Sequence, residues 1–220
     1  MIPPLRTATR GIGAALQHWR RLLWAVAFLL LAIWAGRYPV PDWEGTFVRA
    51  VQSLGGARIQ SFFAAVSWFG DMPRSWIIGS LGVAGLLWLR RGRAALGLGL
   101  GLSLGGVLTA VVKHWIRRPR PSPEEVRVVF AYPHSSFPSG HVVFYTVLCG
   151  FAFLWLRRIP SARNWAWLCI LAVLSVGTSR VYLGAHWPSD VIGGILLGIS
   201  LLAVMEFFLP PRVEHRSRDV

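Results

Sequence analysis

The chain has 220 residues and a formal net charge of +14; 54% of its residues are hydrophobic and its mean hydropathy is +0.51. These values place it among membrane proteins. A nucleic-acid partner is not expected, because the arginines form short clusters between apolar runs and no basic stripe with interleaved aromatic residues is present. The two cysteines, Cys149 and Cys169, lie within apolar runs and lack partners at metal-ligand spacing, so no disulfide framework is indicated.

The N-terminal segment is basic as far as Arg21 and apolar from Leu22, a pattern that superficially resembles a secretory signal. A signal peptide would end at a small-x-small cleavage site, but Trp34 and Arg37 lie where small residues are needed. We therefore predict a retained first membrane helix.

A helix needs roughly 20 apolar residues to cross the hydrocarbon core of a bilayer. Six stretches satisfy this requirement, some with help from their flanks: 20–37, 74–90, 94–112, 140–157, 164–183 and 190–209. The glycine-rich third stretch is expected to pack near the bundle centre, since small residues let helices approach closely in lipid. We predict an all-α integral membrane bundle of six transmembrane helices. A single domain covers 1–220, with a short cytoplasmic tail at 210–220.

An additional amphipathic helix is predicted at the membrane interface within 43–70. Trp43, Phe47, Val51 and Leu54 recur there at helical spacing, with polar residues between them. Such a mixed segment lies more favourably in the interface than in the hydrocarbon core.

The arginines also predict the orientation of the bundle. If the first helix starts inside, the inside segments hold thirteen Lys and Arg residues and the outside segments hold ten. Every short inside loop is basic, as the positive-inside rule requires. We expect a bacterial inner membrane protein with both termini in the cytoplasm and the motif segments on the periplasmic or extracellular side.

The first motif, K-x6-R-P, contains Lys113 and Arg120. Lys113 is the only lysine beside 22 arginines, and an ammonium makes a compact contact with a phosphate oxygen where a guanidinium forks across two. A snorkelling residue at a helix end is the plainer interpretation of Lys113 alone. Arg120 lies between two prolines, which hold its backbone extended and suit it to bidentate phosphate recognition. Arg117 and Arg118 are interpreted as simple headgroup contacts.

The second motif, P-S-G-H, stands directly before an apolar run. One interpretation is that Ser139 is a helix N-cap and has no further function. A helix N-terminus with Gly140 in its first turn is also an anion site, because free backbone amides point at the ligand and the glycine lets a phosphate approach closely. His141 would project toward the same anion.

The third motif, S-R-x5-H-x3-D, contains Arg180, His186 and Asp190. An arginine at a membrane helix end costs a few kcal/mol unless it is paired or hydrated. Asp190 could simply favour the dipole of the last helix. Four residues after His186, it can also accept the imidazole Nδ1–H and leave Nε2 free as a nucleophile. The other histidines, His18, His114, His134 and His215, have no comparable partners, and only His134 is a weak candidate for the substrate loop.

In this order the three motifs, over residues 113–190, resemble the type 2 phosphatidic acid phosphatase family, which belongs to the acid phosphatase and vanadium haloperoxidase superfamily. The resemblance implies a phosphohistidine mechanism in which His186 attacks phosphorus and Asp190 orients it. His141 then protonates the leaving oxygen and afterwards activates water. The equatorial oxygens are expected to be held by the remaining motif residues, Lys113, Arg120, Arg180, Ser139 and Gly140.

The predicted function is metal-independent hydrolysis of a lipid phosphomonoester or diphosphate, such as undecaprenyl diphosphate, phosphatidylglycerophosphate or phosphatidic acid. No cofactor or metal is expected, because no carboxylate cluster is present to hold magnesium or zinc. Two alternatives stay open: a lipid phosphotransferase with the same site, and a non-catalytic transporter or lipid-binding protein. Vanadium haloperoxidase activity ranks last, and the oligomeric state is open.

Overall fold

The structure is a computed structural model that describes residues 5–209, and within that range the regular elements are all helical. The elements, in chain order, are α1 (Leu5–Arg37), α2 (Asp42–Ser53), α3 (Ala57–Trp68), α4 (Arg74–Trp88), α5 (Gly92–Ile116), α6 (Gly140–Leu156), η1 (Pro160–Ala166), α7 (Trp167–Tyr182), α8 (Pro188–Met205) and η2 (Glu206–Phe208). The predicted all-α class is therefore confirmed. The predicted tail at 210–220 lies outside the described residues.

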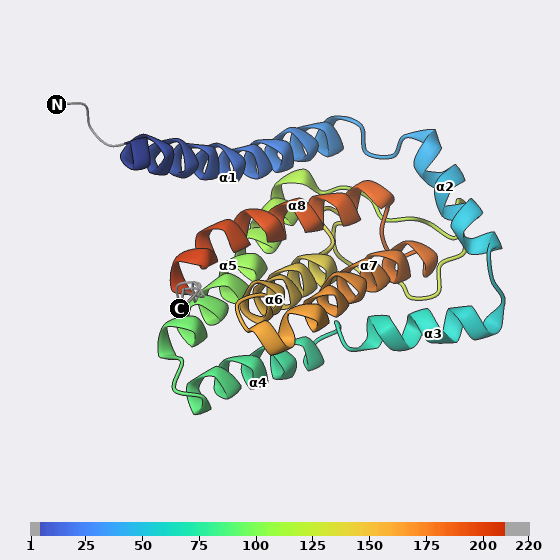
Figure 1. The fold of residues 1–220 in the computed structure, drawn as a ribbon. Coiled ribbons are helices and arrows are strands. Elements are labelled where there is room, and N and C mark those ends of the chain that lie inside the picture. Colours follow the sequence, from blue (N-terminus) through green and yellow to red (C-terminus); the bar gives the residue numbers. More distant parts are fainter. Residues whose placement is uncertain (1–4, 210–220) are drawn as a thin grey trace.

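The helices form a bundle around α6, which packs against α5, α7 and α8 (Figure 1). Helix α1 covers α8, α4 packs against α5, and α3 packs against α7. Each of the six predicted stretches coincides with a helix. Consecutive long helices run in opposite directions, so the α5–α6 and α7–α8 connections meet at one end of the bundle.

The number of membrane spans is confirmed only in part. Within the described residues, three helices are long and apolar enough to cross a bilayer: Gly92–Ile116, Pro160–Tyr182 and Pro188–Met205. The pair Leu22–Arg37 and Asp42–Ser53, bent by 102°, makes a fourth if it counts as one span. Helix α6 is apolar but shorter, with 17 residues, and α4 has 15. Length and composition therefore support an integral membrane protein, whereas the count of six is not confirmed.

Close helix packing around α5 follows from its glycines. A Cβ atom at Gly101 would lie 2.2 Å from the sulfur of Met205 on α8, so the Met205 side chain would have to move for any larger residue. At Gly105 a Cβ atom would come within 3.3 Å of Val143 on α6. The predicted role of this helix in packing is thus confirmed at these positions. Gly99 and Gly106 instead line a cavity between α4, α5 and α6.

The segment 43–70 is two helices, not one. Helix α2 ends at Ser53 and α3 begins at Ala57 after two glycines, residues that weaken a helix interior. Helix α2 buries Glu44, Val48 and Gln52 on its inward face, while Trp43, Phe47 and Leu54 are about half exposed or more. Of the four apolar residues that carried the prediction, Val51 packs against the bundle, and the other three lie as they would at a lipid interface.

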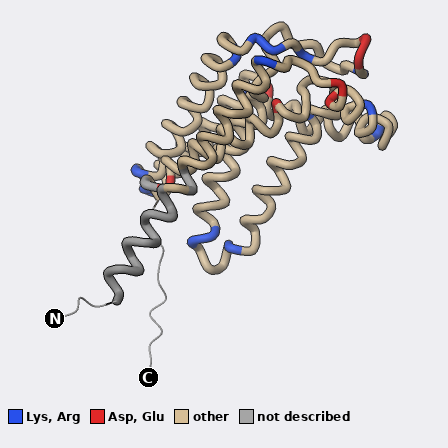
Figure 2. Tube along the Cα trace, turned by 90° about the horizontal axis from the view of Figure 1, so that it is seen from above, with Lys and Arg blue, Asp and Glu red and all other residues tan. Residues whose placement is uncertain are grey.

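Charged residues gather at both ends of the bundle (Figure 2). One end holds the α4–α5 connection with Arg90 and Arg91 and the α6–α7 connection with Arg157. The other end holds the motif segments together with all the acidic residues of the described chain except Glu206. The motif end therefore combines the site cations with all but one of the acidic residues of the described chain.

Candidate active site

The three motifs meet at one end of the bundle. Lys113 is in the last turn of α5, the P-S-G-H segment starts α6, Arg180 is in the last turn of α7, and His186 precedes α8. Antiparallel packing of these helices brings together four helix ends, although Lys113 and His186 are 73 residues apart in the sequence.

His186 and Asp190 lie as the i, i+4 spacing predicts. Nδ1 of His186 is 3.4 Å from Oδ2 of Asp190, and the hydroxyl of Ser136 stands beside both. Oδ2 of Asp190 also accepts a hydrogen bond from the backbone N–H of Trp187 at 2.8 Å. Trp187 is the N-cap residue of α8, so this bond caps the start of the helix. The carboxylate that caps the helix therefore also fixes the imidazole ring.

The other nitrogen of His186 faces a cation. Nη1 of Arg120 lies 3.2 Å from Nε2 of His186 and donates to the carbonyl of Ala185 at 2.6 Å. Burial lowers the pKa of His186 well below its ordinary value, and the cations Arg120, Arg180 and Lys113 add to this effect. The ring is thus neutral at physiological pH, which a nitrogen nucleophile requires.

Asp190 is fully buried, and its counter-charge is Arg118. Nη1 of Arg118 donates to Oδ1 of Asp190 at 2.6 Å and to the hydroxyl of Ser189 at 2.6 Å. Nη2 bonds Glu44 of α2, whose other oxygen accepts the amide of Ser189 at 2.9 Å. The interpretation of Arg118 as a headgroup contact is therefore wrong. Its side chain is inaccessible to solvent because two carboxylates and a hydroxyl hold it in the interior.

The loop before α6 is held by the two cations of the first motif. Lys113 donates to the carbonyls of Ser135 and Ser136, the latter at 3.1 Å. Nε of Arg120 donates to the carbonyl of His134 at 2.6 Å. Burial lowers the pKa of Arg120 to about 10, and neighbouring Arg180 contributes, yet the guanidinium stays charged. Both cations thus point into the site and are fixed by loop carbonyls.

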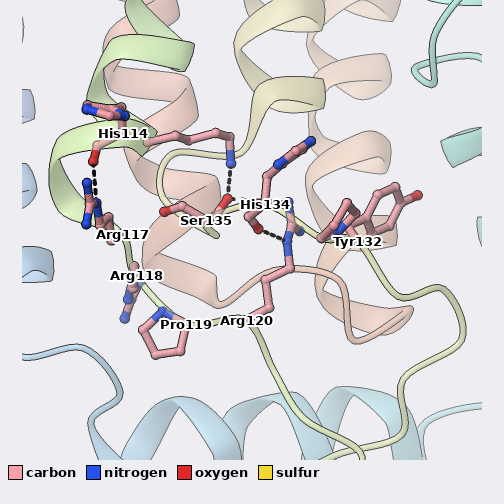
Figure 3. A pocket seen from close by; sticks show the side chains of 10 residues that line it. His114, Arg117, Arg118, Pro119, Arg120, Tyr132, His134 and Ser135 are labelled. Atoms are coloured by element: carbon pink, nitrogen blue, oxygen red, sulfur yellow. Dashed lines mark hydrogen bonds between the residues drawn. The ribbon is translucent and has the colours of Figure 1, made fainter.

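A polar cavity of about 470 Å³ opens at these cations (Figure 3). His134, Ser135, Tyr132 and Arg120 lie together on one side of it. The exposed His134, the weak candidate for a substrate loop, contributes to the lining, so its position is compatible with that role. No carboxylate lines this cavity, and an anion is therefore its natural ligand.

Arg180 ends α7 in a buried position. Its Nη1 donates to the hydroxyls of Ser67 on α3 and of Tyr132, the latter at 3.2 Å. The guanidinium also stands 4.8 Å from the centre of the Tyr132 ring, within cation–π distance. Hydroxyls and a ring thus fix the side chain without neutralising its charge.

Several buried polar atoms around the site lack a hydrogen-bond partner within the described chain. They include Nε of Arg180 and the hydroxyls of Ser135 and Ser139. Ser139 precedes α6, yet its side chain does not cap the helix. A role as N-cap alone is therefore excluded for Ser139 in this structure. A Cβ atom at Gly140 would be 3.6 Å from Thr109, an ordinary contact, so no neighbouring side chain requires glycine there.

His141 has a carboxylate neighbour of its own. Its Nε2 is 3.0 Å from Oδ1 of Asp71, a residue between α3 and α4, although the angle falls short of a hydrogen bond. The sequence pattern alone gave His141 no acidic partner. The structure therefore corrects this expectation.

Six contributors were missed by the sequence motifs: Glu44, Ser67, Asp71, Arg118, Tyr132 and Ser136. Asp71 and Glu44 are carboxylates next to membrane helices, but no histidine lies four residues before either of them, so the spacing that singled out Asp190 does not apply to them. Ser67, Tyr132 and Ser136 have no local signal, because their importance arises only from the side chains they meet. Within residues 5–209, no three His, Cys, Asp or Glu side chains lie together as metal ligands.

Comparison with known proteins identifies a matching family model, related sequences and a similar fold. The family model of the PAP2 superfamily matches residues 94–212. Decaprenylphosphoryl-5-phosphoribose phosphatase of Mycobacterium tuberculosis is 32% identical over 155 residues, which cover 70% of this chain and 82% of that protein. Phosphatidylglycerophosphatase B of Bacillus subtilis is 35% identical over 108 residues, which cover 46% of this chain and about half of that protein (51%).

Among solved structures, a transmembrane PAP2-type phosphatidylglycerolphosphate phosphatase from Bacillus subtilis has the same fold. The TM-score is 0.76 at 23% identity, and the alignment covers 86% of this chain and 96% of the other. At this identity the likeness concerns the fold alone.

Proposed function

This chain belongs to the PAP2 superfamily, and we propose that it hydrolyses a phosphate ester or diphosphate of a membrane lipid through a phosphohistidine on His186. The observation that carries the proposal is the position of the His186 ring. Nδ1 faces a buried carboxylate, and Nε2 faces Arg120 at 3.2 Å. A neutral ring fixed at one nitrogen and directed at cations with the other is arranged to attack an anionic phosphoryl group.

In the first step, the Nε2 lone pair of His186 attacks phosphorus while the bond from phosphorus to the lipid oxygen breaks. The ring gains positive charge, and Asp190 stabilises it through Nδ1–H. His141 donates a proton to the departing lipid oxygen. The products of this step are phosphohistidine and a protonated lipid alcohol or lipid phosphate.

In the second step, water attacks the phosphorus of the phosphohistidine and the N–P bond breaks. His141, now neutral, accepts the proton of the water. Inorganic phosphate leaves, His186 regains its lone pair, and His141 is protonated again. The cycle thus restores both rings without a redox partner.

Cations and helix amides would hold the oxygens that carry charge throughout. Arg120, Arg180 and Lys113 converge on the nucleophile, and their combined field lowers the pKa of His186. The unpartnered Nε of Arg180 and hydroxyl of Ser139 are further donors for a phosphoryl oxygen. Fixed donors of this kind do most of the work in phosphoryl transfer.

An apolar cavity supports a lipid substrate. It has a volume of about 920 Å³ and runs between α4, α5 and α6, from Gly70 and Gly140 beside His141 to Leu87 near the other end. Several lining residues, such as Trp76 and Val107, are more than half exposed, so the cavity opens sideways toward lipid. A tail in this groove would place the leaving oxygen next to the proposed acid His141.

We further propose that the site faces the periplasmic or extracellular side, with both termini cytoplasmic, because the basic loops lie at the opposite end of the bundle. Undecaprenyl diphosphate, phosphatidylglycerophosphate and phosphatidic acid are the candidate substrates. A phosphotransferase would use the same first step and replace water with a lipid acceptor. The charges of the described residues gather at the ends of the bundle, which favours surface chemistry over a transport path through its middle.

Trapping the intermediate tests the proposal. The purified protein in detergent, with excess EDTA, is mixed with labelled lipid phosphates and with nitrophenyl phosphate, whose leaving group needs no proton. We expect phosphate release by the wild type and acid-labile label on His186. His186→Ala should abolish both label and turnover, whereas His141→Ala should accumulate labelled protein because water activation is lost.

Three outcomes would overturn parts of this proposal. Label on His141 or on a serine would overturn the assignment of the nucleophile. Activity that disappears in EDTA and returns with magnesium would overturn the metal-independent mechanism. A tightly bound lipid phosphate that is never cleaved would favour a lipid-binding protein.

A further inference from the structure

Asp71 lies outside all three motifs and contacts the proposed acid. It stands in the short connection between α3 and α4, and its Oδ1 is 3.0 Å from Nε2 of His141. Resting on the proposed function, we propose that Asp71 is a positioning residue for His141: it holds the ring beside the leaving oxygen and stabilises its protonated form.

The carboxylate of Asp71 is itself fixed from two sides. The hydroxyl of Tyr132 donates to Oδ1 at 3.2 Å, and Nη2 of Arg74 donates to Oδ2 at 3.4 Å. Partial burial acts to raise the pKa of Asp71, but contacts with His141 and Tyr132 and the nearby Arg180 outweigh it, so the pKa is lowered. The lowered pKa keeps the Asp71 carboxylate ionised at neutral pH.

His141 needs such a partner because its other charged neighbours are cations. Its ring is largely buried, with Arg180 and Arg120 close enough to oppose a positive charge on it. Among the described residues, Asp71 is the carboxylate in contact with this ring. Burial of an unpaired charge is costly, and a carboxylate at 3.0 Å offsets part of that cost for an imidazolium.

The backbone beside Asp71 fixes the ring position as well. A Cβ atom at Gly70 would lie 2.2 Å from Cδ2 of His141, so the loop backbone packs directly against the imidazole. Gly70 also lines the apolar groove. Asp71 thus acts where the groove reaches the site, which is the side on which a lipid leaving group would depart.

The role predicts that the effect of Asp71→Asn depends on the leaving group. With an alkyl lipid phosphate, kcat/KM should fall roughly 10- to 100-fold, a part of the roughly 10²- to 10⁴-fold that a general acid contributes. With nitrophenyl phosphate, kcat/KM should change less than about 3-fold, because that leaving group needs no proton. Its kcat should still fall, with a parallel fall in KM and accumulation of phosphohistidine, because His141 becomes a weaker base.

Three further variants sharpen the test. Asp71→Glu should restore part of the lost rate. In a His141→Ala background, Asp71→Asn should have no additional effect, because the residue acts through the ring. Glu124→Gln removes a fully exposed loop carboxylate and should leave both substrates unaffected.

The possible failures are distinguishable. If the wild type releases phosphate but Asp71→Asn lowers kcat/KM equally for both substrates, or adds its full effect to His141→Ala, this inference is overturned and the proposed function stands. If the wild type releases phosphate from neither substrate, the proposed function is overturned and the inference with it.

Discussion

At the scale of single residues, Arg118 is the least expected member of the site. Its side chain has no solvent exposure, and it bridges Glu44 of α2 to Asp190 of α8. Two buried carboxylates without this guanidinium would be unpaired, and removing one partner of a buried pair costs about 3–5 kcal/mol. Arg118 therefore favours the charged form of Asp190 and holds the carboxylate in place behind the His186 ring.

Neighbouring Arg117 provides a matched control for this role, because it is exposed and bonds only the carbonyl of His114 in the described structure. We expect Arg118→Gln to lower the midpoint of thermal unfolding in detergent by several degrees and turnover by at least about 10-fold. Arg117→Gln should leave the midpoint nearly unchanged. Thermal melts of both variants check this, and equal shifts would contradict a structural role for Arg118.

The low pKa of His186 makes a prediction about pH. The imidazole of His186 must be neutral to attack phosphorus, so kcat/KM should fall as the pH drops through the pKa of His186. Because the pKa of His186 is lowered below the ordinary value of 6.5, this acid limb should lie below pH 6.5. Arg120→Gln removes the nearest cation, so the pKa of His186 should rise and the limb should move to higher pH. The measurement compares the midpoint pH of the acid limb in the wild type and in Arg120→Gln. The height of the kcat/KM profile is not used, because it also reflects the loss of phosphate binding by Arg120.

At the scale of helices, hydrophobic runs predicted the positions of the long helices but not the partners of each face. In α2 the apolar pattern pointed to Trp43 and Phe47, yet the face that packs inward carries Glu44 and Gln52. These polar groups are buried because distant residues satisfy them, such as Arg118 for Glu44. No local pattern encodes such a partner, and hydropathy alone assigns the face to solvent.

The motifs themselves were predictable because each lies at a helix end. Antiparallel helices bring Lys113, His141, Arg180 and His186 to one end once the spans are assigned. The position of the motif residues at one end of the bundle does not reveal the role of each side chain. Whether Ser139 caps a helix or binds a ligand depends on where its hydroxyl points, and whether His141 has an acidic partner depends on the α3–α4 connection.

The groove between α4, α5 and α6 predicts tail selectivity. At Gly106 a Cβ atom meets no neighbour within 4 Å, so Gly106→Leu should fit without a clash and fill the groove. We expect kcat/KM to fall about 10-fold or more for a long-chain lipid phosphate, since lost apolar contacts with the tail cost about 0.8 kcal/mol per CH₂. Nitrophenyl phosphate, which has no tail, should be hydrolysed as by the wild type.

Gly85→Leu on α4 is the matched control, because its Cβ position is equally open and Gly85 does not line the groove. It should leave both substrates unaffected. An equal loss for both substrates in Gly106→Leu would indicate a damaged fold, and an unchanged rate with the long-chain lipid would show that the tail lies elsewhere.

At the scale of the whole molecule, the two ends of the bundle differ in their chemistry. The end with the motifs carries the acidic residues and the cations of the site, whereas the short loops of the opposite end are basic. Only Lys and Arg count in the positive-inside rule, and the excess of cations predicted for the inside segments is small. The rule therefore leaves the orientation to be decided by an accessibility measurement.

Single cysteines at the two ends of the bundle test its orientation in the membrane. In a background with Cys149→Ala and Cys169→Ala, Glu124→Cys places a thiol on the exposed loop of the motif end, and Ser161→Cys places one on the exposed η1 turn of the opposite end. In intact cells an impermeant maleimide should label the first and not the second, with labelling of the second after the membrane is opened. The reverse pattern would put the site in the cytoplasm, where it would meet lipid phosphates of the inner leaflet. Because the same residues would still form the same site, that result would change the substrate pool and leave the chemistry intact.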